Sequence, residues 1–546
     1  MYTHCPIIVA VSGLAILIIG IVSTWYGFPA LVEWQINKNT IMENTSQAFK
    51  VWKKQPFPML FKVYLFNVTN TDSVMAGATP ILKEVGPYVY DIHIERDITE
   101  IDDDADTIKY FLIKKFHFNT KASGCRSEHE MITIINAPLM GTLLKVESIA
   151  PQMLNLVNDA YTYIYPGITD MFLRVHVSDL LFGGITLFCS AEEIKTLCSA
   201  MRFSLPSNMK RAKNNKDFIF SMFGKFNETA FGPFEMTRGI TNTTRGSLIS
   251  YKEDPVLDYW SGDLCNMLNG SDSGLYERMT EPVDKIYSFN PEICRSIGIS
   301  FEKKITRSNF AAYKYSITEE SLSHKGSDQC FCEEVGGEYE CPLDGLLNLD
   351  SCIRAPILMS NPHFYLADKS LLNYTKGMHP LKTSHESFLI IEPNTATPVS
   401  GAKRVQMNVE VKQFEAFPLT RSMPEGVFPI LWIEEGVDLP SDLLAHLEFS
   451  FRKIAYLDFL KWILIVAGVV LIILAFILIM KREGLMCFAS KGSLQINDGK
   501  NMVTHIRAFE DISFTAPTGP PQADDPIFKI GKENNNNSNV AWPYRE

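Results

Sequence analysis

The stretch "WILIVAGVVLIILAFILIM", Trp462–Met480, limits the fold more than any other part of the chain. Its 19 residues include no charged side chain, and Lys461 and Lys481 stand on either side. About 20 apolar residues of helix span the hydrocarbon core of a bilayer, and in lipid a helix satisfies its own backbone polar groups. A core helix of a soluble protein would carry a polar stripe, which is missing here. We therefore predict a membrane span over residues 462–480.

A second apolar stretch lies at the other end of the chain. "IIVAVSGLAILIIGIVSTW", Ile7–Trp25, also lacks charge. A cleaved signal peptide is the alternative, but such a peptide begins with basic residues, and "MYTHCP" contains neither Lys nor Arg. We predict an uncleaved span over 7–25. The remaining parts are then an N-terminal tail, a large exported domain and a Pro-rich, polar C-terminal tail predicted to be disordered: 1–6, 26–461 and 481–546.

The glycosylation sequons indicate which side of the membrane the middle of the chain occupies. Six N-x-S/T triplets lie between the two stretches and one, at Asn536, lies beyond them; the six begin at Asn44, Asn67, Asn227, Asn242, Asn269 and Asn373. Their clustering predicts glycosylation of an extracellular domain. We expect a plasma-membrane protein with both termini in the cytoplasm. Cys5 and Cys487 would then lie near the inner face, where S-palmitoylation and unmodified thiols are equally consistent.

Four cysteines crowd into "CFCEEVGGEYECPLDGLLNLDSC", residues 330–352. Their spacing is C-x-C-x8-C-x10-C, and Cys265 and Cys294 lie upstream. A zinc site is the alternative, but it favours paired C-x2-C knuckles. Disulfides persist in exported domains. We therefore predict three disulfides among the six, and we expect no metal and no cofactor.

The exported domain shows both strand and helix patterns. β-branched and aromatic residues with partial alternation predict strands at 60–68, 86–98, 107–119 and 404–417. Apolar residues three or four apart predict helices between Met140 and Cys198. Within that block, Ser190 and Glu193 match a capping box. The fold class is therefore α+β, with a block of helices inserted into an antiparallel sheet.

Another local pattern lies within the helical block. In "SDLLFGG", Ser178 or Asp179 is a possible helix N-cap, and Gly183–Gly184 is a stop signal.

The acidic run "DDDAD", residues 102–106, is either a calcium loop or a solvated turn. Because the run lacks the spacing and the glycine of an EF-hand, we favour the turn.

No catalytic signature stands out. "GSDSG", residues 270–274, resembles a nucleophile elbow but has Asp272 where that motif needs Ser. "SEHEM", residues 127–131, lacks the second histidine of a zinc protease. The net charge of -11 gives no sign of nucleic-acid binding. We predict that the chain is not an enzyme and has no catalytic residues.

Several stretches together resemble the class B scavenger receptor family. The resemblance covers both apolar stretches and nearly the whole exported domain, and it rests on the six-cysteine pattern and on "FKVYLFNVTN", "EVGPYVY", "FEMTRGI", "CNMLNGSDSG", "FNPEICRSI" and "HESFLIIEPNTATPVSGAKRVQMNVEVK". Within that family the chain is most similar to insect sensory neuron membrane proteins. The resemblance implies a β-barrel-like antiparallel core, a helical-bundle cap at about 140–200 and an enclosed hydrophobic tunnel.

The resemblance also implies specific residues. The pairing it carries over is Cys265–Cys330, Cys294–Cys352 and Cys332–Cys341. Four apolar residues near the cap are candidate ligand contacts, although each is also consistent with ordinary core: Phe172, Leu180, Leu181 and Phe182.

The chain departs from the family pattern in two places. Cys125, Cys189 and Cys198 fall outside the six, so at least one of the nine cysteines of the exported domain is free or pairs between chains. We expect that Cys189 and Cys198 cannot bridge if a straight helix joins them, because nine residues at 1.5 Å rise exceed disulfide reach. The cap segment "IYPGITD" lacks the clustered lysines of some members, which argues against capture of anionic particles.

The function implied is that of a receptor for hydrophobic, fatty-acid-derived ligands such as lipid pheromones or odorants. The ligand would pass through the tunnel to membrane lipid or to a neighbouring chemoreceptor. Odorant-binding proteins and an odorant receptor complex are the expected partners. The alternatives are general lipid or lipoprotein uptake and, less favoured because the tail lacks a sorting motif, lysosomal carriage.

Overall fold

The computed structural model describes residues 5–203, 205–241, 244–307 and 310–483. Contacts group Met1–Ile479 into one compact unit and Met480–Glu546 into a second. Of the second unit, only the end of the last helix is described, so the account below concerns the first.

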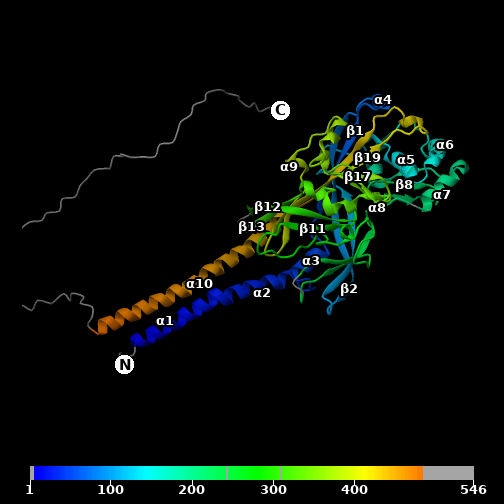
Figure 1. The fold of residues 1–546 in the computed structure, drawn as a ribbon. Coiled ribbons are helices and arrows are strands. Elements are labelled where there is room, and N and C mark those ends of the chain that lie inside the picture. The colour runs from blue at the N-terminus through cyan, green and yellow to red at the C-terminus, as the bar shows by residue number, and fades with distance from the viewer. Residues whose placement is uncertain (1–4, 204, 242–243, 308–309, 484–546) are drawn as a thin grey trace, which may run out of the picture. The chain divides into compact units, whose positions relative to one another are not determined.

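Long helices stand at both ends of the first unit (Figure 1). The N-terminal helix consists of α1 (Cys5–Val22), a π-helical turn η1 (Ser23–Gly27) and α2 (Phe28–Thr40), and the C-terminal helix is α10 (Ser441–Arg482). Both are long and apolar enough to cross a membrane, and little of their apolar surface is buried. The two predicted membrane helices are therefore present, and each continues well beyond its apolar stretch.

Glycines allow α1 and α10 to pack closely. A Cβ added at Gly468 would lie 2.7 Å from the backbone nitrogen of Leu17, and one at Gly13 would lie 3.0 Å from the backbone nitrogen of Ile472. Small residues at such contacts let helix backbones approach each other in a membrane. The ring centroids of Trp25 and Trp462 are 6.5 Å apart. The two predicted spans therefore form a packed pair.

An antiparallel sheet forms the core of the exported domain. In spatial order its main path is β10 (Leu248–Tyr251), β9 (Ala230–Thr237), β3 (Thr107–Phe118), β2 (Leu82–Asp102), β1 (Met59–Val68), β20 (Gly426–Asp438), β19 (Thr397–Val411), β18 (Phe388–Glu392), β13 (Phe310–Ser316), β12 (Arg295–Arg307) and β11 (Lys285–Asn290). Two short strands extend it beside β19: β17 (Ile357–Ser360) and β16 (Leu347–Asn348). The strands predicted from alternation are confirmed at 60–68, 86–98 and 107–118, and the one predicted at 404–417 ends at Val411.

The ladder of this sheet does not close into a barrel, so the barrel-like expectation holds only in part. Its end strands are β10 and β11. A two-residue segment joins them: the Leu248 amide donates to the Gly270 carbonyl, and the Phe289 amide donates to the Ser271 carbonyl. A Cβ at Gly270 would lie 1.9 Å from the Tyr287 carbonyl oxygen, so only glycine fits this approach. We call Gly270–Ser271 the seam.

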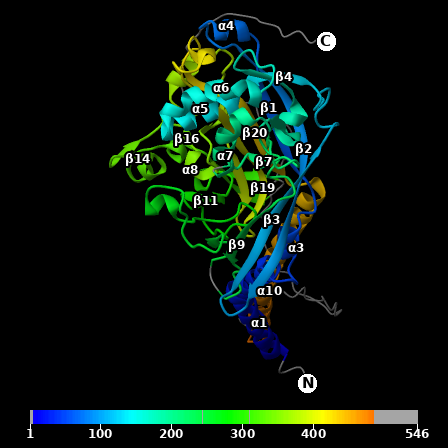
Figure 2. The ribbon, with the colours of Figure 1, turned by 90° about the vertical axis from the view of Figure 1, so that its right-hand side faces the viewer.

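A mixed helical and β cap covers one face of the sheet (Figure 2). Its helices are α5 (Ala137–Ile149), α6 (Leu154–Ile164) and α7 (Lys195–Phe203), and its strands are β4 (Met131–Ile135), β5 (Phe172–His176), β6 (Ile185–Leu187), β7 (Met209–Arg211) and β8 (Phe218–Phe220). The predicted helices are thus confirmed in part, because strands interrupt them. The other short elements of the domain are α3 (Gln47–Lys53), α4 (Thr71–Met75), α8 (Asp350–Ile353), α9 (Lys382–His385), β14 (Glu333–Val335) and β15 (Glu338–Glu340).

The capping predictions in the cap were wrong. Ser190 does not cap a helix; its hydroxyl donates to the Asp217 carboxylate at 2.9 Å. The helical turn begins later, at Glu192. "SDLLFGG" forms a single π-helical turn, Asp179–Gly183, without a side-chain cap, although Gly184 does end it with a φ of 105°.

Four disulfides lie in the exported domain. Cys265 is bonded to Cys330, Cys294 to Cys352 and Cys332 to Cys341, the pairs that the resemblance implied. Cys189 and Cys198 are bonded as well, with their Cα atoms 5.9 Å apart. No straight helix joins this last pair, since α7 begins only at Lys195, so the condition that would have prevented bridging is not met. Cys125 is a free, exposed thiol, which accounts for the odd count.

Candidate ligand-binding site

A narrow apolar cavity lies between the sheet and the segments that cover it. The centre of a water molecule can move through about 60 Å³ of it, and the surrounding space not filled by protein atoms, part of it open solvent, is about 690 Å³. Its lining is Phe61, Ile92, Lys114, Phe116, Ser207, Asn208, Met222, Phe223, Phe226, Glu292, Leu349, Ile353, Ile357, Met407, Ile433 and Glu435. Most of these side chains are aliphatic or aromatic, so the cavity suits a hydrophobic chain better than a polar molecule.

Strand alternation creates the apolar wall of this cavity. Phe61 on β1 lies opposite Glu435 on β20, and Ile92 on β2 lies opposite Phe116 on β3. Because successive side chains in a strand point to opposite faces, these positions share one face of four adjacent strands. The rings of Phe61 and Phe116 meet edge to face, with centroids 5.2 Å apart. The sheet therefore supplies a rigid floor.

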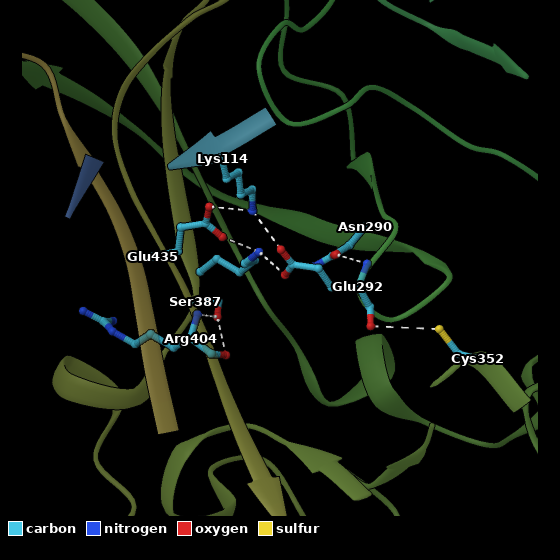
Figure 3. A network of polar contacts seen from close by, with 8 residues as sticks. Lys114, Asn290, Glu292, Cys352, Ser387, Arg404 and Glu435 are labelled. Atoms are coloured by element: carbon cyan, nitrogen blue, oxygen red, sulfur yellow. Dashed lines mark hydrogen bonds and ion pairs between the residues drawn. The ribbon is translucent and has the colours of Figure 1, made fainter. Parts of the chain in front are cut away.

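Four charged side chains form a closed network at one side of the cavity (Figure 3). Lys114 Nζ lies 2.8 Å from Glu292 Oε1 and 3.1 Å from Glu435 Oε1. Lys403 Nζ lies 3.4 Å from Glu292 Oε2 and is also paired with Glu435 Oε2. Each carboxylate thus uses one oxygen for each lysine. We call these four residues the ion quartet.

Three members of the quartet have pKa values that are shifted in favour of their charged forms. Burial alone would raise the pKa of Glu292 and Glu435, but the ammonium groups of Lys114 and Lys403 outweigh it and hold both carboxyl pKa values below normal. Burial likewise opposes the charge on Lys114, yet the two carboxylates raise its pKa above normal. The cavity lining therefore carries one positive and two negative charges, and Lys403, which does not line the cavity, brings the sum of the quartet to zero.

A second ion cluster lies on the other face of the same strands. Glu434, the neighbour of Glu435, accepts from Lys62 at 2.6 Å and from Arg404 at 2.7 Å. None of these three residues lines the cavity described above. Two consecutive glutamates in one strand thus serve opposite faces of the sheet, and each has two basic partners.

None of the four candidate ligand residues lines this cavity, but the ring of Phe182 lies beside it, and the carbonyls of Leu180 and Leu181 accept from the amides of the lining residues Met222 and Phe223. The Phe182 ring is 5.2 Å from that of Phe116 and 6.1 Å from that of Phe223, both of which line the cavity. Phe172 is buried and packs against the Phe428 ring, while Leu180 and Leu181 are fully buried in the core. Sequence reasoning missed the quartet and the lining residues, and the only signal for them was the pair of consecutive glutamates, Glu434 and Glu435.

The predicted modification sites differ in exposure. Asn44 and Asn373 are exposed, whereas Asn67, Asn227 and Asn269 are half-buried. Asn67 and Asn227 also accept hydrogen bonds through their side chains, from the amides of Thr133 and Phe116. Cys5 is exposed at the start of α1. Three positions lie outside the described residues: Asn242, Asn536 and Cys487.

The motifs that resembled catalytic or metal sites have structural roles. Asp272 of "GSDSG" is buried and accepts from Arg96 and from the Tyr110 hydroxyl, each at 2.8 Å. The run "DDDAD" forms the turn between β2 and β3, where Asp102 accepts from two backbone amides, and the interpretation as a turn is confirmed. Glu130 of "SEHEM" accepts from the Tyr88 hydroxyl at 2.9 Å.

One described cluster has the composition of a metal site. His324 lies near the sulfur atoms of Cys332 and Cys341. Those sulfurs are bonded to each other, and the thiolate form that binds zinc is therefore not present. The cluster is a disulfide beside a histidine.

Comparison with known proteins agrees with this arrangement of sheet, cap and terminal helices. Residues 11–479 match the model of the CD36 family. The chain is 37% identical over 494 residues to sensory neuron membrane protein 2 of Heliothis virescens, covering 88% of this chain and 95% of that protein. It is 36% identical to sensory neuron membrane protein 2 of Manduca sexta, covering 86% and 92%. It is 31% identical to sensory neuron membrane protein 1 of Apis mellifera, covering 84% and 88%.

Two anchoring helices, an antiparallel sheet under a helical cap and a disulfide-rich exported domain thus accompany a sequence match over nearly the whole chain. The chain belongs to the CD36 family.

Proposed function

We propose that the chain is a cell-surface receptor that captures hydrophobic, fatty-acid-derived molecules in the apolar cavity of its exported domain. The observation that carries the proposal is the cavity itself, which is lined mostly by aliphatic and aromatic side chains. Burying an acyl chain yields about 0.8 kcal/mol per CH2, so a long chain needs few polar contacts. From the cavity the ligand passes through the domain to membrane lipid or to a neighbouring chemoreceptor.

The sensory role of the receptor is proposed from its relatives, which are named sensory neuron membrane proteins. Lipid pheromones or odorants are then the ligands, with odorant-binding proteins and an odorant receptor complex as partners. General uptake of lipoprotein is less favoured, because the cap segment 164–170 contains no lysine and its Asp170 is paired with Arg174.

Filling the cavity tests this proposal. Ile353 lines the cavity from the short helix α8, away from the sheet, so Ile353→Trp adds bulk with little disturbance of the sheet. Overpacking usually costs about 1–3 kcal/mol of stability, which the domain can tolerate. We expect the variant to reach the cell surface and to lose most of its binding of hexadecanol and its lipid-evoked response.

Ile249→Trp is the matched control. Ile249 lies on β10, is exposed and does not line the cavity. This variant should bind hexadecanol as the wild type does. Undiminished binding and response in Ile353→Trp, with the cavity shown to be filled, would instead mean that the ligand binds elsewhere on the domain.

A further inference from the structure

The ion quartet leaves no charge free to bind a ligand. Each oxygen of Glu292 and Glu435 is paired with a lysine, and both lysines are paired twice. Glu435 also lies directly opposite Lys403 in the ladder between β20 and β19, so the backbone register holds this pair together. The quartet is therefore a neutral, preorganised unit rather than a cation site awaiting an anion.

A free carboxylate entering the cavity would find no counter-charge. It would have to displace Glu292 or Glu435 from one of its two lysines, and three carboxylates would then share two ammonium groups, which leaves one negative charge uncompensated. Burying an unpaired charge is far more costly than burying a neutral polar group. The cavity thus disfavours the binding of an anionic head group, although its lining accepts an apolar chain.

The cavity does offer neutral hydrogen-bonding groups. Ser207 and Asn208 line it from the segment after α7. The Asn208 Oδ1 atom is buried and has no hydrogen-bond partner among the described residues. A buried acceptor without a partner is costly, and a ligand hydroxyl would satisfy it. Because an amide can turn to present its NH2 group instead, it can also donate to a ligand carbonyl.

We propose that this cavity takes the uncharged, oxygen-bearing head of a lipid, as in a long-chain alcohol, aldehyde or ester, and rejects the free carboxylate. The inference rests on the proposed function, since it assumes that the cavity is where lipid binds. It goes further by assigning the chemical class of the head group and the residues that select it.

The first experiment compares two probes with the same chain length. Equilibrium binding of radiolabelled hexadecanol and hexadecanoate is measured on the full chain in nanodiscs, with empty nanodiscs subtracted. We expect hexadecanol to bind at least about tenfold more tightly than hexadecanoate. Equal affinities, both lost in Ile353→Trp, would overturn this inference alone. If neither probe binds, the proposed function fails and the inference fails with it.

A basic rim outside the cavity requires a control. Lys225 and Arg354 are exposed and immediately adjoin two lining residues, Phe226 and Ile353. Any hexadecanoate that remains bound in Ile353→Trp lies outside the cavity, and such binding agrees with exclusion of the carboxylate from the interior.

The chain supplies an exact pair of variants for the second experiment. Glu435→Gln breaks the neutrality of the quartet and leaves one positive charge in excess. We expect it to raise the affinity for hexadecanoate about tenfold. Glu434→Gln changes the adjacent glutamate, which also has two basic partners but lies on the other face. That variant should leave the preference unchanged.

Two further variants provide independent tests of the quartet and of Asn208. Glu292→Gln should act as Glu435→Gln does, and it replaces that variant if Glu435→Gln fails to fold. Asn208→Leu should weaken the binding of hexadecanol several-fold without weakening that of hexadecane, which has no head group. If hexadecanoate affinity is unchanged in both folded glutamine variants of the quartet, the quartet does not select the head group.

Discussion

A buried carboxylate, that of Asp272, fastens two inner strands of the sheet, β2 and β3, to the seam. Arg96 on β2 donates to Asp272 through Nε at 2.8 Å and to the Trp52 carbonyl through Nη1 at 2.6 Å. Asp272 also accepts from the Tyr110 hydroxyl and from the Gly274 amide. Since Asp272 directly follows the seam, its carboxylate connects the seam to β2, β3 and the end of α3.

Neutralising this aspartate should therefore destabilise the domain strongly. Asp272→Asn leaves Arg96 buried without its counter-charge, and losing one partner of a buried pair costs about 3–5 kcal/mol. The measurement is thermal unfolding of the full chain in detergent micelles, followed by tryptophan fluorescence. Glu100→Gln removes an exposed partner of Lys109 on the same hairpin and should leave the transition unchanged. Equal transitions in the two variants would contradict the proposed role of Asp272.

The same carboxyl group makes stability depend on pH. Burial would raise the pKa of Asp272, but Arg96 and the hydrogen bonds outweigh it and hold that pKa below its usual value. The unfolded chain therefore binds a proton first as the pH falls. The contribution of Asp272 to stability is complete above its unfolded pKa of about 3.9 and is lost progressively below it. Unfolding followed against pH should show a shallower loss in this range for Asp272→Asn.

Residue-level chemistry was the part least predictable from the sequence. "GSDSG" resembles a nucleophile elbow, yet its glycines serve backbone contacts: a Cβ at Gly274 would lie 2.3 Å from Arg96 Nη2. The paired residues of the quartet are separated by between 32 and 321 residues, and no local pattern links them. The consecutive glutamates in "LWIEEGV", residues 431–437, were the one available signal, because in a strand they must face opposite sides.

At the scale of elements, the disulfides formed by Cys330 and by Cys332 close loops of very different length. Cys265 and Cys330 are 65 residues apart, whereas Cys332 and Cys341 are 9 apart and close the β14–β15 hairpin. Chain entropy predicts that the longer loop stabilises the fold by about 4 kcal/mol and the shorter by about 2.6 kcal/mol. Both bonds are of one chemical kind, so their comparison isolates loop length.

Double serine variants test this difference. We expect Cys265→Ser/Cys330→Ser to unfold at a clearly lower temperature than Cys332→Ser/Cys341→Ser under non-reducing conditions. Peptide mapping without reductant provides the control that the remaining bonds are intact. If removing the hairpin bond is the more damaging change, the stabilisation does not follow loop length.

Strands and spans were predictable because their signals are local, namely alternation and uninterrupted apolar sequence. The residue at which a helix begins is harder to predict, because contacts with residues far away in the sequence also affect it. Ser190 and Glu193 form the expected pair in sequence, but Asp217, 27 residues away, takes the Ser190 hydroxyl. Because α7 begins only at Lys195, the segment between Cys189 and Cys198 is not a straight helix and the two cysteines can bridge. The seam that bridges the two end strands of the open sheet was not predictable either, because it is a two-residue contact rather than a strand.

For the whole molecule, two membrane-crossing helices and the family make this a plasma-membrane protein. Its orientation is a prediction that glycosylation can check. Removing N-glycans enzymatically from the full chain should lower its mass. A variant in which all six sequons of the exported domain are changed from Asn to Gln should show no such shift, although Asn536 remains. A residual shift in that variant would place the C-terminus outside the cell.

The helix α10 also sets the distance between the sheet and the bilayer. Phe451 packs against Phe310 of the sheet, with ring centroids 5.6 Å apart. From there to Trp462, where we predict the hydrocarbon to begin, the unbroken helix rises about 16 Å. The sheet is thus held at a fixed distance above the bilayer. A lipid molecule that leaves the domain must cross that distance. Along that distance the exposed rings of Tyr456 and Phe459 offer an apolar surface, so the path between protein and membrane need not run through open water.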